Sequence, residues 1–359
     1  MMKSSLSVEA IDLVDADAPR RIQILSCEGD RPLAGRVAIQ HEVRQALAAA
    51  EVRLGMLAMT INPADLLQIN GAYGVQPSLP YTPGHEGVAV VLEVADDVTD
   101  LRPGDVVIPM AAGGTWCDER VLARRFVSAV EGDVDILQCA MLSANPVTAW
   151  VLLNAMVPLP AQSCVIQNAA NSAVGQCMRQ LAATLGVRLI NIVRRHDAID
   201  QARLGDEHWI VDDGFGSDEL VARVRQLSAG CRIPLALDAI AGDATAKLGA
   251  ALDNGGRVVV YGLLGKQPSR VEPADLIFRG VSVQGFWLAS WFSDPQNRAM
   301  AKKVMPQLLS LQASGALHMS VAATYDLQQV IPALTHADQP HRTGKVLLTG
   351  SWLSRLTKT

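Results

Sequence analysis

The most constraining feature of the sequence is a regular alternation of short apolar runs with helix-like segments between Ser163 and Phe286. We expect strands at residues 163–167, 187–193, 208–211, 234–238, 257–261 and 281–286. Helical patterns fall between them, among others at Gly175–Leu185, Asp218–Ala229 and Asp243–Leu252. Such alternation is typical of a parallel sheet with helices on both faces. Six strands are the number in a complete dinucleotide-binding fold, so the sequence predicts an α/β, doubly wound sheet.

The first part of the chain, up to about residue 140, shows short β segments separated by turns. The β-branched run Val88–Val94 is followed by Pro103 and Gly104, and then by Val106–Ile108. Pro presets φ and Gly accepts positive φ, so this pair marks a turn. Many short strands between turns favour a closed or rolled β domain.

The end of the chain contains one long helical stretch, Pro295–Ala313, and a final strand-like run, Lys345–Leu348. Because the parallel sheet already has its six strands, we expect this tail to return to the β domain. The predicted organisation is residues 1–143 for the first part of the β domain, residues 144–291 for the nucleotide-binding domain and residues 292–359 for the returning part.

Composition and charge exclude several classes of protein. With 49% hydrophobic and 19% charged residues, the chain has the opposite balance from a disordered protein. A net charge of −5 without a Lys/Arg-rich block argues against a nucleic-acid partner. The six cysteines are scattered, which is typical of reduced thiols. The first twenty residues lack a sustained apolar run and no segment is long enough to span a bilayer, so we expect a cytoplasmic protein.

A nucleotide site is indicated where the apolar run Cys164–Ile166 leads into Gln167–Gly175 and a helix follows. In a dinucleotide-binding fold, free backbone N–H groups and the helix dipole hold the pyrophosphate at this junction. The three glycine positions of the usual fingerprint are Ala170, Ser172 and Gly175, so only the last is Gly. Small residues at the crowded positions favour a nucleotide site over a plain βα turn.

The choice of cofactor is indicated at the end of the second predicted strand, about 20 residues after the turn. A site for NADH would place Asp or Glu there, but the chain has Arg194, Arg195 and His196. A cation at this point suits a 2′-phosphate, so the sequence predicts NADPH. Two solvated surface arginines remain the alternative interpretation.

The segment Gly84–Gly87 is similar to the zinc-ligand motif of zinc-dependent alcohol dehydrogenases. A catalytic zinc needs three protein ligands of N, S or O type. The segments that would supply cysteines, Ile61–Asp65 and Ser143–Pro146, contain none. We therefore interpret His85 and Glu86 as hydrogen-bonded structural residues and expect no metal.

Together these segments resemble the medium-chain dehydrogenase/reductase superfamily, and within it the zinc-free, NADPH-dependent trans-2-enoyl-CoA/ACP (enoyl thioester) reductases. The resemblance covers roughly residues 50–350. Its most specific parts are the runs Gln167–Gly175 and Gly285–Leu288, whereas Ile61–Asp65 and Gly84–Gly87 are shared with zinc-free quinone reductases. Further matching segments are Asn70–Gly74, Asn145–Ala149, Tyr261–Gly262 and Gly265–Pro268.

The resemblance implies a GroES-like β domain that houses the chemistry, a Rossmann domain that binds NADPH, and a homodimer. It implies that Tyr73, in the run Asn-Gly-Ala-Tyr-Gly, is the proton donor. By motif position it also implies cofactor contacts from Asn145, Asn171, Ser172, Ala173, Val174, Arg194, Arg195, His196, Tyr261, Gly262, Leu263, Leu264, Phe286, Trp287, Leu288, Ala289 and Lys345. The chain departs from the family pattern at Ala72, at Ala173 and over its first fifty or so residues.

The implied reaction is reduction of the C=C bond of a trans-2-enoyl thioester of the fatty acyl or polyketide type. Hydride adds to the β-carbon, and Tyr73 protonates the α-carbon. A tyrosine with an ordinary pKa of roughly 10 keeps its proton at neutral pH and can give it to a basic enolate. Two alternatives stay open. One is a zinc-free quinone or enone oxidoreductase, which would not depend on Tyr73; the other is a catalytically silent dinucleotide-binding protein.

Overall fold

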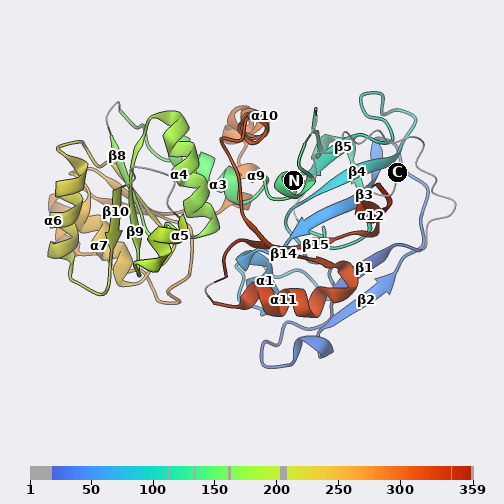
Figure 1. Ribbon diagram of the computed structural model, residues 1–359, viewed down its shortest axis with the longest axis horizontal. Coiled ribbons are helices and arrows are strands. Elements are labelled where there is room, and N and C mark those ends of the chain that lie inside the picture. The colour runs from blue at the N-terminus through green and yellow to red at the C-terminus, as the bar shows by residue number, and fades with distance from the viewer. Residues whose placement is uncertain are drawn as a thin grey trace. The chain divides into compact units, whose positions relative to one another are not determined.

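The computed structural model describes residues 18–110, 113–132, 134–160, 163–202, 208–340 and 342–356. These residues belong to two compact units (Figure 1). Unit 1 comprises Met1–Ala144 and His318–Thr359, and unit 2 comprises Asn145–Leu317. Within the described residues, no helix combines the length and the apolar character that crossing a membrane requires.

The sheet of unit 2 has six parallel strands in the order β10-β9-β8-β11-β12-β13. This is the 3-2-1-4-5-6 order of a dinucleotide-binding fold, so the predicted fold class is confirmed. The strands are β8 (Cys164–Gln167), β9 (Arg188–Val193), β10 (His208–Val211), β11 (Leu235–Asp238), β12 (Arg257–Val260) and β13 (Ser282–Gly285). β8 is the third strand of this order and all four of its residues are buried, so the turn after it lies at the carboxyl edge near the centre of the sheet.

Helices cover both faces of this sheet, with α4 and α5 on one side and α6 and α7 on the other (Figure 1). Apolar residues of the central strands, such as Ile166 and Val258, form the core with Leu220 and Leu248 of the covering helices. The helices of unit 2 are α3 (Asn145–Asn154), α4 (Ala173–Leu185), α5 (Asp197–Ala202), α6 (Ser217–Ser228), α7 (Asp243–Ala251), α8 (Pro273–Phe278), α9 (Leu288–Ser293), the short 3₁₀ turn η3 (Pro295–Asn297) and α10 (Arg298–Ala313).

The second boundary between the units differs from the predicted one. The expected returning segment began at residue 292, but unit 2 continues to Leu317. The reason is helix α10, which packs against α3 of unit 2. There the indole nitrogen of Trp150 donates a hydrogen bond of 2.9 Å to the side chain of Gln307. The chain therefore returns to unit 1 only from His318 onward.

Unit 1 is the β-rich domain that the sequence predicts. Its main sheet has the order β14-β15-β3-β4-β5-β7, with β6 also pairing with β3, and β1 pairs with β2 separately. The strands are β1 (Arg20–Ile24), β2 (Val37–His41), β3 (Glu51–Thr60), β4 (Gly87–Val94), β5 (Val106–Pro109), β6 (Glu119–Ala123), β7 (Val127–Ala129), β14 (Val321–Asp326) and β15 (Lys345–Thr349). The helices and 3₁₀ turns are η1 (Leu33–Gly35), α1 (Pro63–Ile69), η2 (Arg124–Phe126), α2 (Ile136–Cys139), η4 (Leu327–Gln329), α11 (Val330–Asp338) and α12 (Ser351–Leu356).

The last strand, β15, lies inside the sheet of unit 1. It pairs parallel with β14 and antiparallel with β3, where Leu347 lies opposite Thr60. Gly344, directly before β15, has φ of +95°, and a Cβ built there would lie 2.8 Å from the backbone oxygen of Ser320. Only glycine tolerates this close turn. The strand therefore brings Lys345 to the N-terminus of α1, where its ammonium group donates a hydrogen bond to Asn62.

Candidate active site

The turn between β8 and α4 has the form that a dinucleotide pyrophosphate requires. Ser172 is the N-cap of α4, and its hydroxyl oxygen accepts the N–H of Gly175 at 3.1 Å. The first helical N–H groups, those of Ala173 and Val174, have no partner inside the helix and are free to bind an anion. A Cβ on Gly175 would lie 2.7 Å from the carbonyl oxygen of Ala170. Gly175, the only glycine of the fingerprint that this sequence retains, therefore stands where a side chain would not fit.

The two replaced glycines do not obstruct this turn. Ala170 is fully buried, and its N–H donates 3.2 Å to the carbonyl of Ile192 on β9. The tight bend falls one residue earlier, at Ala169, which has φ of +46°. Ser172 replaces the second glycine with a helix cap. The turn keeps exposed N–H groups and small side chains, so this part of unit 2 fits a bound dinucleotide.

Buried polar side chains tie this turn to the next strand end. The amide of Asn168 donates 2.6 Å to the carboxylate of Asp238 and accepts the N–H of Ala239 at 2.8 Å. Asp238 is fully buried and also accepts hydrogen bonds from Ile240, Ala241 and Thr245. The sequence reasoning missed both residues. Asn168 directly follows a buried strand and Asp238 is the last residue of another, so each is only a polar residue at a strand end, and the contact spans 70 residues.

The cationic segment after β9 is exposed, as a 2′-phosphate site requires. Arg194, Arg195 and His196 all lie on the surface at the end of this strand. Arg195 forms an ion pair of 3.1 Å with Asp197, whereas Arg194 has no ion-pair partner within the described residues. Arg194 is thus the cation with an uncommitted charge at the expected position.

In the segment after β12, Gly262 is closely packed, whereas Leu263 and Leu264 are exposed to solvent. A Cβ on Gly262 would lie 2.5 Å from the carbonyl oxygen of Ala239, so no larger residue fits without movement of the backbone. Leu263 and Leu264 are more than half exposed, at 62% and 57%. The hydroxyl of Tyr261 is buried, and desolvation followed by the charge of Asp238 raises its pKa. A phenol of this kind stays neutral.

The remaining predicted contacts of unit 2 divide between two places. Phe286, Trp287, Leu288 and Ala289 follow β13 and begin α9, with Trp287 44% exposed. The other place is the first turn of α3, where Asn145 is almost buried. No contact with a cofactor can be read from these positions, so the roles of these residues stay predictions.

Tyr73 belongs to unit 1, on the loop that follows α1. Its side chain is partly exposed. Gly71 precedes it with φ of +71°, and a Cβ there would approach the backbone oxygen of Cys27 to 3.0 Å. The Tyr73 ring contacts the ring of His85 edge-on, with 5.6 Å between centroids. The loop therefore presents a phenol beside an imidazole.

His85 is held by a carboxylate rather than left alone. Its Nδ1 lies 2.5 Å from Oδ1 of Asp65, which is fully buried in the first turn of α1. The other oxygen of Asp65 accepts the N–H of Asn62 at 2.7 Å. Burial lowers the pKa of His85, but the charge and hydrogen bond of Asp65 outweigh burial and raise the pKa above its ordinary value.

Glu86 and Lys345 are joined through Asn62. Glu86 is fully buried and accepts hydrogen bonds from Thr60 at 2.8 Å, from Asn62 at 2.9 Å and from the N–H of Ala144 at 2.8 Å. The side-chain oxygen of Asn62 accepts a hydrogen bond from the buried ammonium of Lys345. The predicted cofactor contact Lys345 is thus placed in unit 1, near the start of α1. The interpretation of His85 and Glu86 as hydrogen-bonded residues agrees with these contacts.

No cluster of three or more His, Cys, Asp or Glu side chains that could hold a metal occurs in the described part of the chain. The six cysteines are free thiols.

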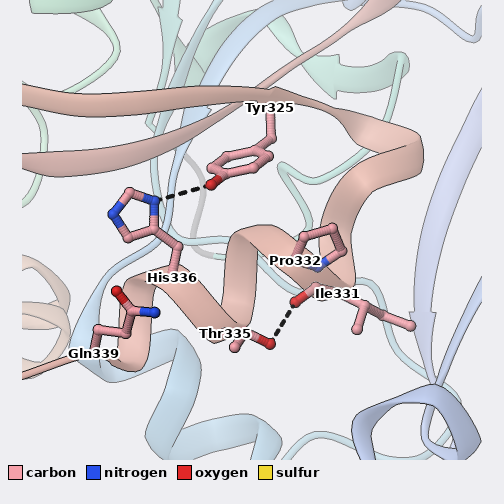
Figure 2. A pocket seen from close by; sticks show the side chains of 6 residues that line it. All are labelled: Tyr325, Ile331, Pro332, Thr335, His336 and Gln339. Carbon is pink, nitrogen blue, oxygen red and sulfur yellow. Dashed lines mark hydrogen bonds between the residues drawn. The ribbon is translucent and has the colours of Figure 1, made fainter.

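Unit 1 also has a surface pocket of about 530 Å³ that the sequence did not indicate (Figure 2). It lies against α11 and β14 and is lined by Tyr325, Ile331, Pro332, Thr335, His336 and Gln339. The hydroxyl of Tyr325 and Nδ1 of His336 are 3.0 Å apart (Figure 2). This second tyrosine–histidine pair is separate from Tyr73 and His85.

Comparisons with known proteins agree with this division of the chain. Residues 48–131 match the alcohol dehydrogenase GroES-like domain family, and residues 173–310 match the zinc-binding dehydrogenase family. The protein named mitochondrial enoyl-[acyl-carrier-protein] reductase of Xenopus tropicalis is 37% identical over 307 residues, which cover 83% of this chain and 87% of that protein.

Two solved structures share the whole architecture. A putative NADPH:quinone reductase from Bacillus thuringiensis is similar with a TM-score of 0.83 and 27% identity, over 93% of this chain and 100% of that chain. A complex of Etr1p with NADP and crotonyl-CoA is similar in fold with a TM-score of 0.82 and 23% identity, over the same shares of the two chains. With its GroES-like unit, its Rossmann unit and a relative of this identity and coverage, the chain belongs to the enoyl-[acyl-carrier-protein] reductase family of the medium-chain dehydrogenase/reductase superfamily.

Proposed function

We propose that the protein is an NADPH-dependent reductase of trans-2-enoyl thioesters. The observation that carries the proposal is Tyr73, a partly exposed phenol next to an imidazole in the GroES-like unit. The relative from Xenopus tropicalis, which is named an enoyl-[acyl-carrier-protein] reductase, supports the same reaction class. The thioester carrier would be coenzyme A or an acyl carrier protein.

Unit 2 would hold NADPH through its backbone and the exposed guanidinium of Arg194. The N-terminus of α4, with Ser172, Ala173 and Val174, suits the pyrophosphate. Arg194 suits the 2′-phosphate because a guanidinium binds phosphate oxygens in a planar, bidentate manner. NADPH, when bound, supplies the hydride that adds to the β-carbon of the enoyl group.

Unit 1 would supply the proton. Hydride addition to the β-carbon moves negative charge onto the thioester oxygen and makes the α-carbon basic. Tyr73 donates its hydroxyl proton to that carbon, so that one hydride and one proton saturate the double bond. A tyrosine on a partly exposed loop is suited to this step, because its hydroxyl carries a proton that it can donate to a basic carbon.

The test is NADPH oxidation with crotonyl-CoA by the wild type and by Tyr73→Phe. We expect turnover by the wild type and a loss of roughly 10²-fold or more in kcat for the variant, as for removal of a direct proton donor. Tyr325→Phe, which removes the hydroxyl of the other pair, is the matched control and should keep the wild-type rate. A Tyr73→Phe enzyme as fast as the wild type would contradict the donor role.

A second candidate is a zinc-free NADPH quinone or enone oxidoreductase. It is favoured by the likeness to the structure from Bacillus thuringiensis, which is named a putative NADPH:quinone reductase. Quinone reduction needs no proton on carbon, so Tyr73→Phe should be as active as the wild type with a quinone. A protein that binds NADPH weakly or not at all, and reduces neither substrate, would instead be a silent dinucleotide-binding protein.

We also propose that two copies associate through unit 2 as a homodimer. Strand β13 is an end strand of the six-stranded sheet, and its free edge could pair with its counterpart in a second copy. The neighbouring helix α8 exposes Leu276, Ile277 and Phe278, with Phe278 80% exposed. Light scattering should give twice the chain mass for the wild type and one chain mass for Ile277→Asp/Phe278→Asp. A monomeric wild type would contradict the proposal.

A cytoplasmic location is proposed as well, on the six free thiols, which suit a reducing compartment. Cell fractionation tests it.

A further inference from the structure

A tyrosine that donates a proton has to recover it before the next turnover. Under the proposed function, Tyr73 becomes a tyrosinate when the α-carbon is protonated. That anion is a negative charge that has to be stabilised until a proton returns. The groups around Tyr73 therefore decide how the anion is stabilised and where the replacement proton comes from.

His85 is the titratable ring in contact with Tyr73. The two rings meet edge-on, with centroids 5.6 Å apart and planes at 63°. They come from different segments: Tyr73 from the loop after α1, and His85 from the residues directly before β4. The contact is therefore made by the tertiary fold and not by neighbours in the sequence.

Asp65 orients the ring of His85 through a hydrogen bond to Nδ1. Its Oδ1 is 2.5 Å from Nδ1 of His85, and its Oδ2 accepts the N–H of Asn62 at 2.7 Å. Because both oxygens are engaged and the residue is fully buried, the carboxylate cannot turn away from the ring. Nε2 of His85 is left without a hydrogen-bond partner among the described residues, and the side chain is 23% exposed, so solvent reaches the ring.

The charges around His85 favour its imidazolium form. Burial lowers the pKa of His85, but Asp65, through its charge and its hydrogen bond, and the nearby Glu86 raise the pKa above the ordinary value. Glu86 is itself held by hydrogen bonds from Thr60, Asn62 and Ala144. The ammonium of Lys345 lies on the other side of Asn62 and is bonded to it. With its pKa raised in this way, the ring of His85 keeps its second proton to higher pH than a free histidine.

We propose that His85, oriented by Asp65, is a positioning residue that stabilises the tyrosinate of Tyr73 and returns a proton to it. This inference rests on the proposed function. The Nε2–H bond breaks and the O–H bond of Tyr73 forms, directly or through one water molecule. A neutral imidazole is left on Asp65, and a proton from solvent then restores Nε2–H. The cycle consumes one proton from water and needs no further oxidant or reductant.

Unit 1 contains an internal control for this arrangement. Tyr325 and His336 also form an edge-on pair, with centroids 5.9 Å apart, and they share a hydrogen bond of 3.0 Å (Figure 2). In the described part of the chain no carboxylate is hydrogen-bonded to His336. Changing this pair removes the same chemical groups from the same unit without touching Tyr73.

The experiment measures kcat with crotonyl-CoA against pH for the wild type, His85→Gln, Asp65→Asn and His336→Gln. NADPH affinity and the thermal midpoint of each variant check that it is folded. We expect the wild-type kcat to fall as the pH rises through the raised pKa of His85. Asp65→Asn removes the charge that raises this pKa, so the fall should move to lower pH. His85→Gln should lose this limb of the profile and lower kcat roughly tenfold, less than loss of the donor itself.

Added imidazole provides a second readout that a structural role would not change. His85→Ala should regain part of its kcat as imidazole is added, and the gain should follow the imidazolium concentration. His336→Gln should keep the wild-type profile and should not respond to imidazole. If His85→Gln does not fold, two other results test the role of His85. These are the shift to lower pH of the fall in kcat for Asp65→Asn and the response of His85→Ala to imidazole.

Two negative results are distinguishable. A wild-type pH profile in His85→Gln and Asp65→Asn, with no effect of imidazole and an inactive Tyr73→Phe, would overturn the inference and leave the proposed function standing. A fully active Tyr73→Phe would overturn the donor role itself, and the inference with it.

Discussion

In unit 2 the residues that shape the nucleotide turn act mainly through their backbone and their small size. In unit 1 the residues around Tyr73 act through buried charge. Gly175 and Gly262 leave no room for a Cβ, with backbone oxygens 2.7 Å and 2.5 Å from where it would lie. Around Tyr73, by contrast, Asp65 and Glu86 are fully buried carboxylates. The difference teaches that the turn around Gly175 is sensitive to added volume and the surroundings of Tyr73 to a lost partner.

The largest effect on stability is expected from Glu86→Ala in unit 1. The change removes the acceptor of three buried hydrogen bonds and leaves their donors without partners, so the free energy of unfolding should fall by about 3 kcal/mol or more. Urea unfolding measures it. Glu28→Ala, in an exposed ion pair with Arg31, is the control and should have a much smaller effect. Equal effects would contradict the view that buried charge holds this region.

Gly175→Ala is the corresponding change in unit 2. The new Cβ would lie 2.7 Å from the oxygen of Ala170, so the turn must shift, and NADPH should bind roughly tenfold more weakly, the equivalent of about 1.4 kcal/mol. Fluorescence titration of NADPH measures the affinity. Gly216→Ala, at a helix start with no atom within 4 Å of the new Cβ, should bind NADPH as the wild type does. An unchanged affinity for Gly175→Ala would show that the turn can absorb added volume.

In unit 2 the largest effect of an exposed charge is expected at the segment after β9. Arg194→Ala should reduce the preference for NADPH over NADH by up to about tenfold, since it removes an exposed guanidinium that has no ion-pair partner among the described residues. Arg195→Ala should reduce the preference less, because Arg195 is already paired with Asp197. Steady-state KM values for both cofactors check this. The reverse ranking would assign the 2′-phosphate to Arg195.

The smallest expected effect is a gain. Ala169 has φ of +46°, which costs an alanine about 1 kcal/mol, and Ala169→Gly should recover part of it. Ala229→Gly, at φ of +50° after α6, should give a similar gain far from the nucleotide turn. Thermal unfolding measures both. If only Ala169→Gly changed NADPH affinity as well, the strained turn itself would be part of the binding site.

The parts of the fold that were predicted correctly are those that depend on local sequence patterns. The six strands of unit 2 are short runs that contain β-branched or aliphatic residues, fully buried in the central strand β8, and each was found within a residue or two of its expected bounds. The second unit boundary lies later in the chain than predicted, because α10 packs on α3. The contact between Trp150 and Gln307 that joins these helices is not visible in any local sequence pattern. Packing partners distant in the sequence decide such boundaries.

The site shows the same limit. The nucleotide turn and the cationic segment were recognisable because each lies at a fixed place after a strand. The link between Asn168 and Asp238 and the link between Asp65 and His85 were not, since they join residues 70 and 20 positions apart. The sequence placed Lys345 among the cofactor contacts. The structure shows its ammonium bonded to Asn62, and the cofactor role stays a prediction.

The position of β15 has a consequence for how the chain is made. This strand, Lys345–Thr349, lies between β14 and β3 in the sheet of unit 1. A ribosome has therefore released all of unit 2 before the strand that completes unit 1 emerges. Unit 2 can fold during synthesis, whereas the end of β3 at Ala58–Thr60 lacks its partner strand until Leu347–Thr349 emerge. Unit 2 is therefore the first unit whose sheet can be completed, although its residues follow most of unit 1 in the sequence.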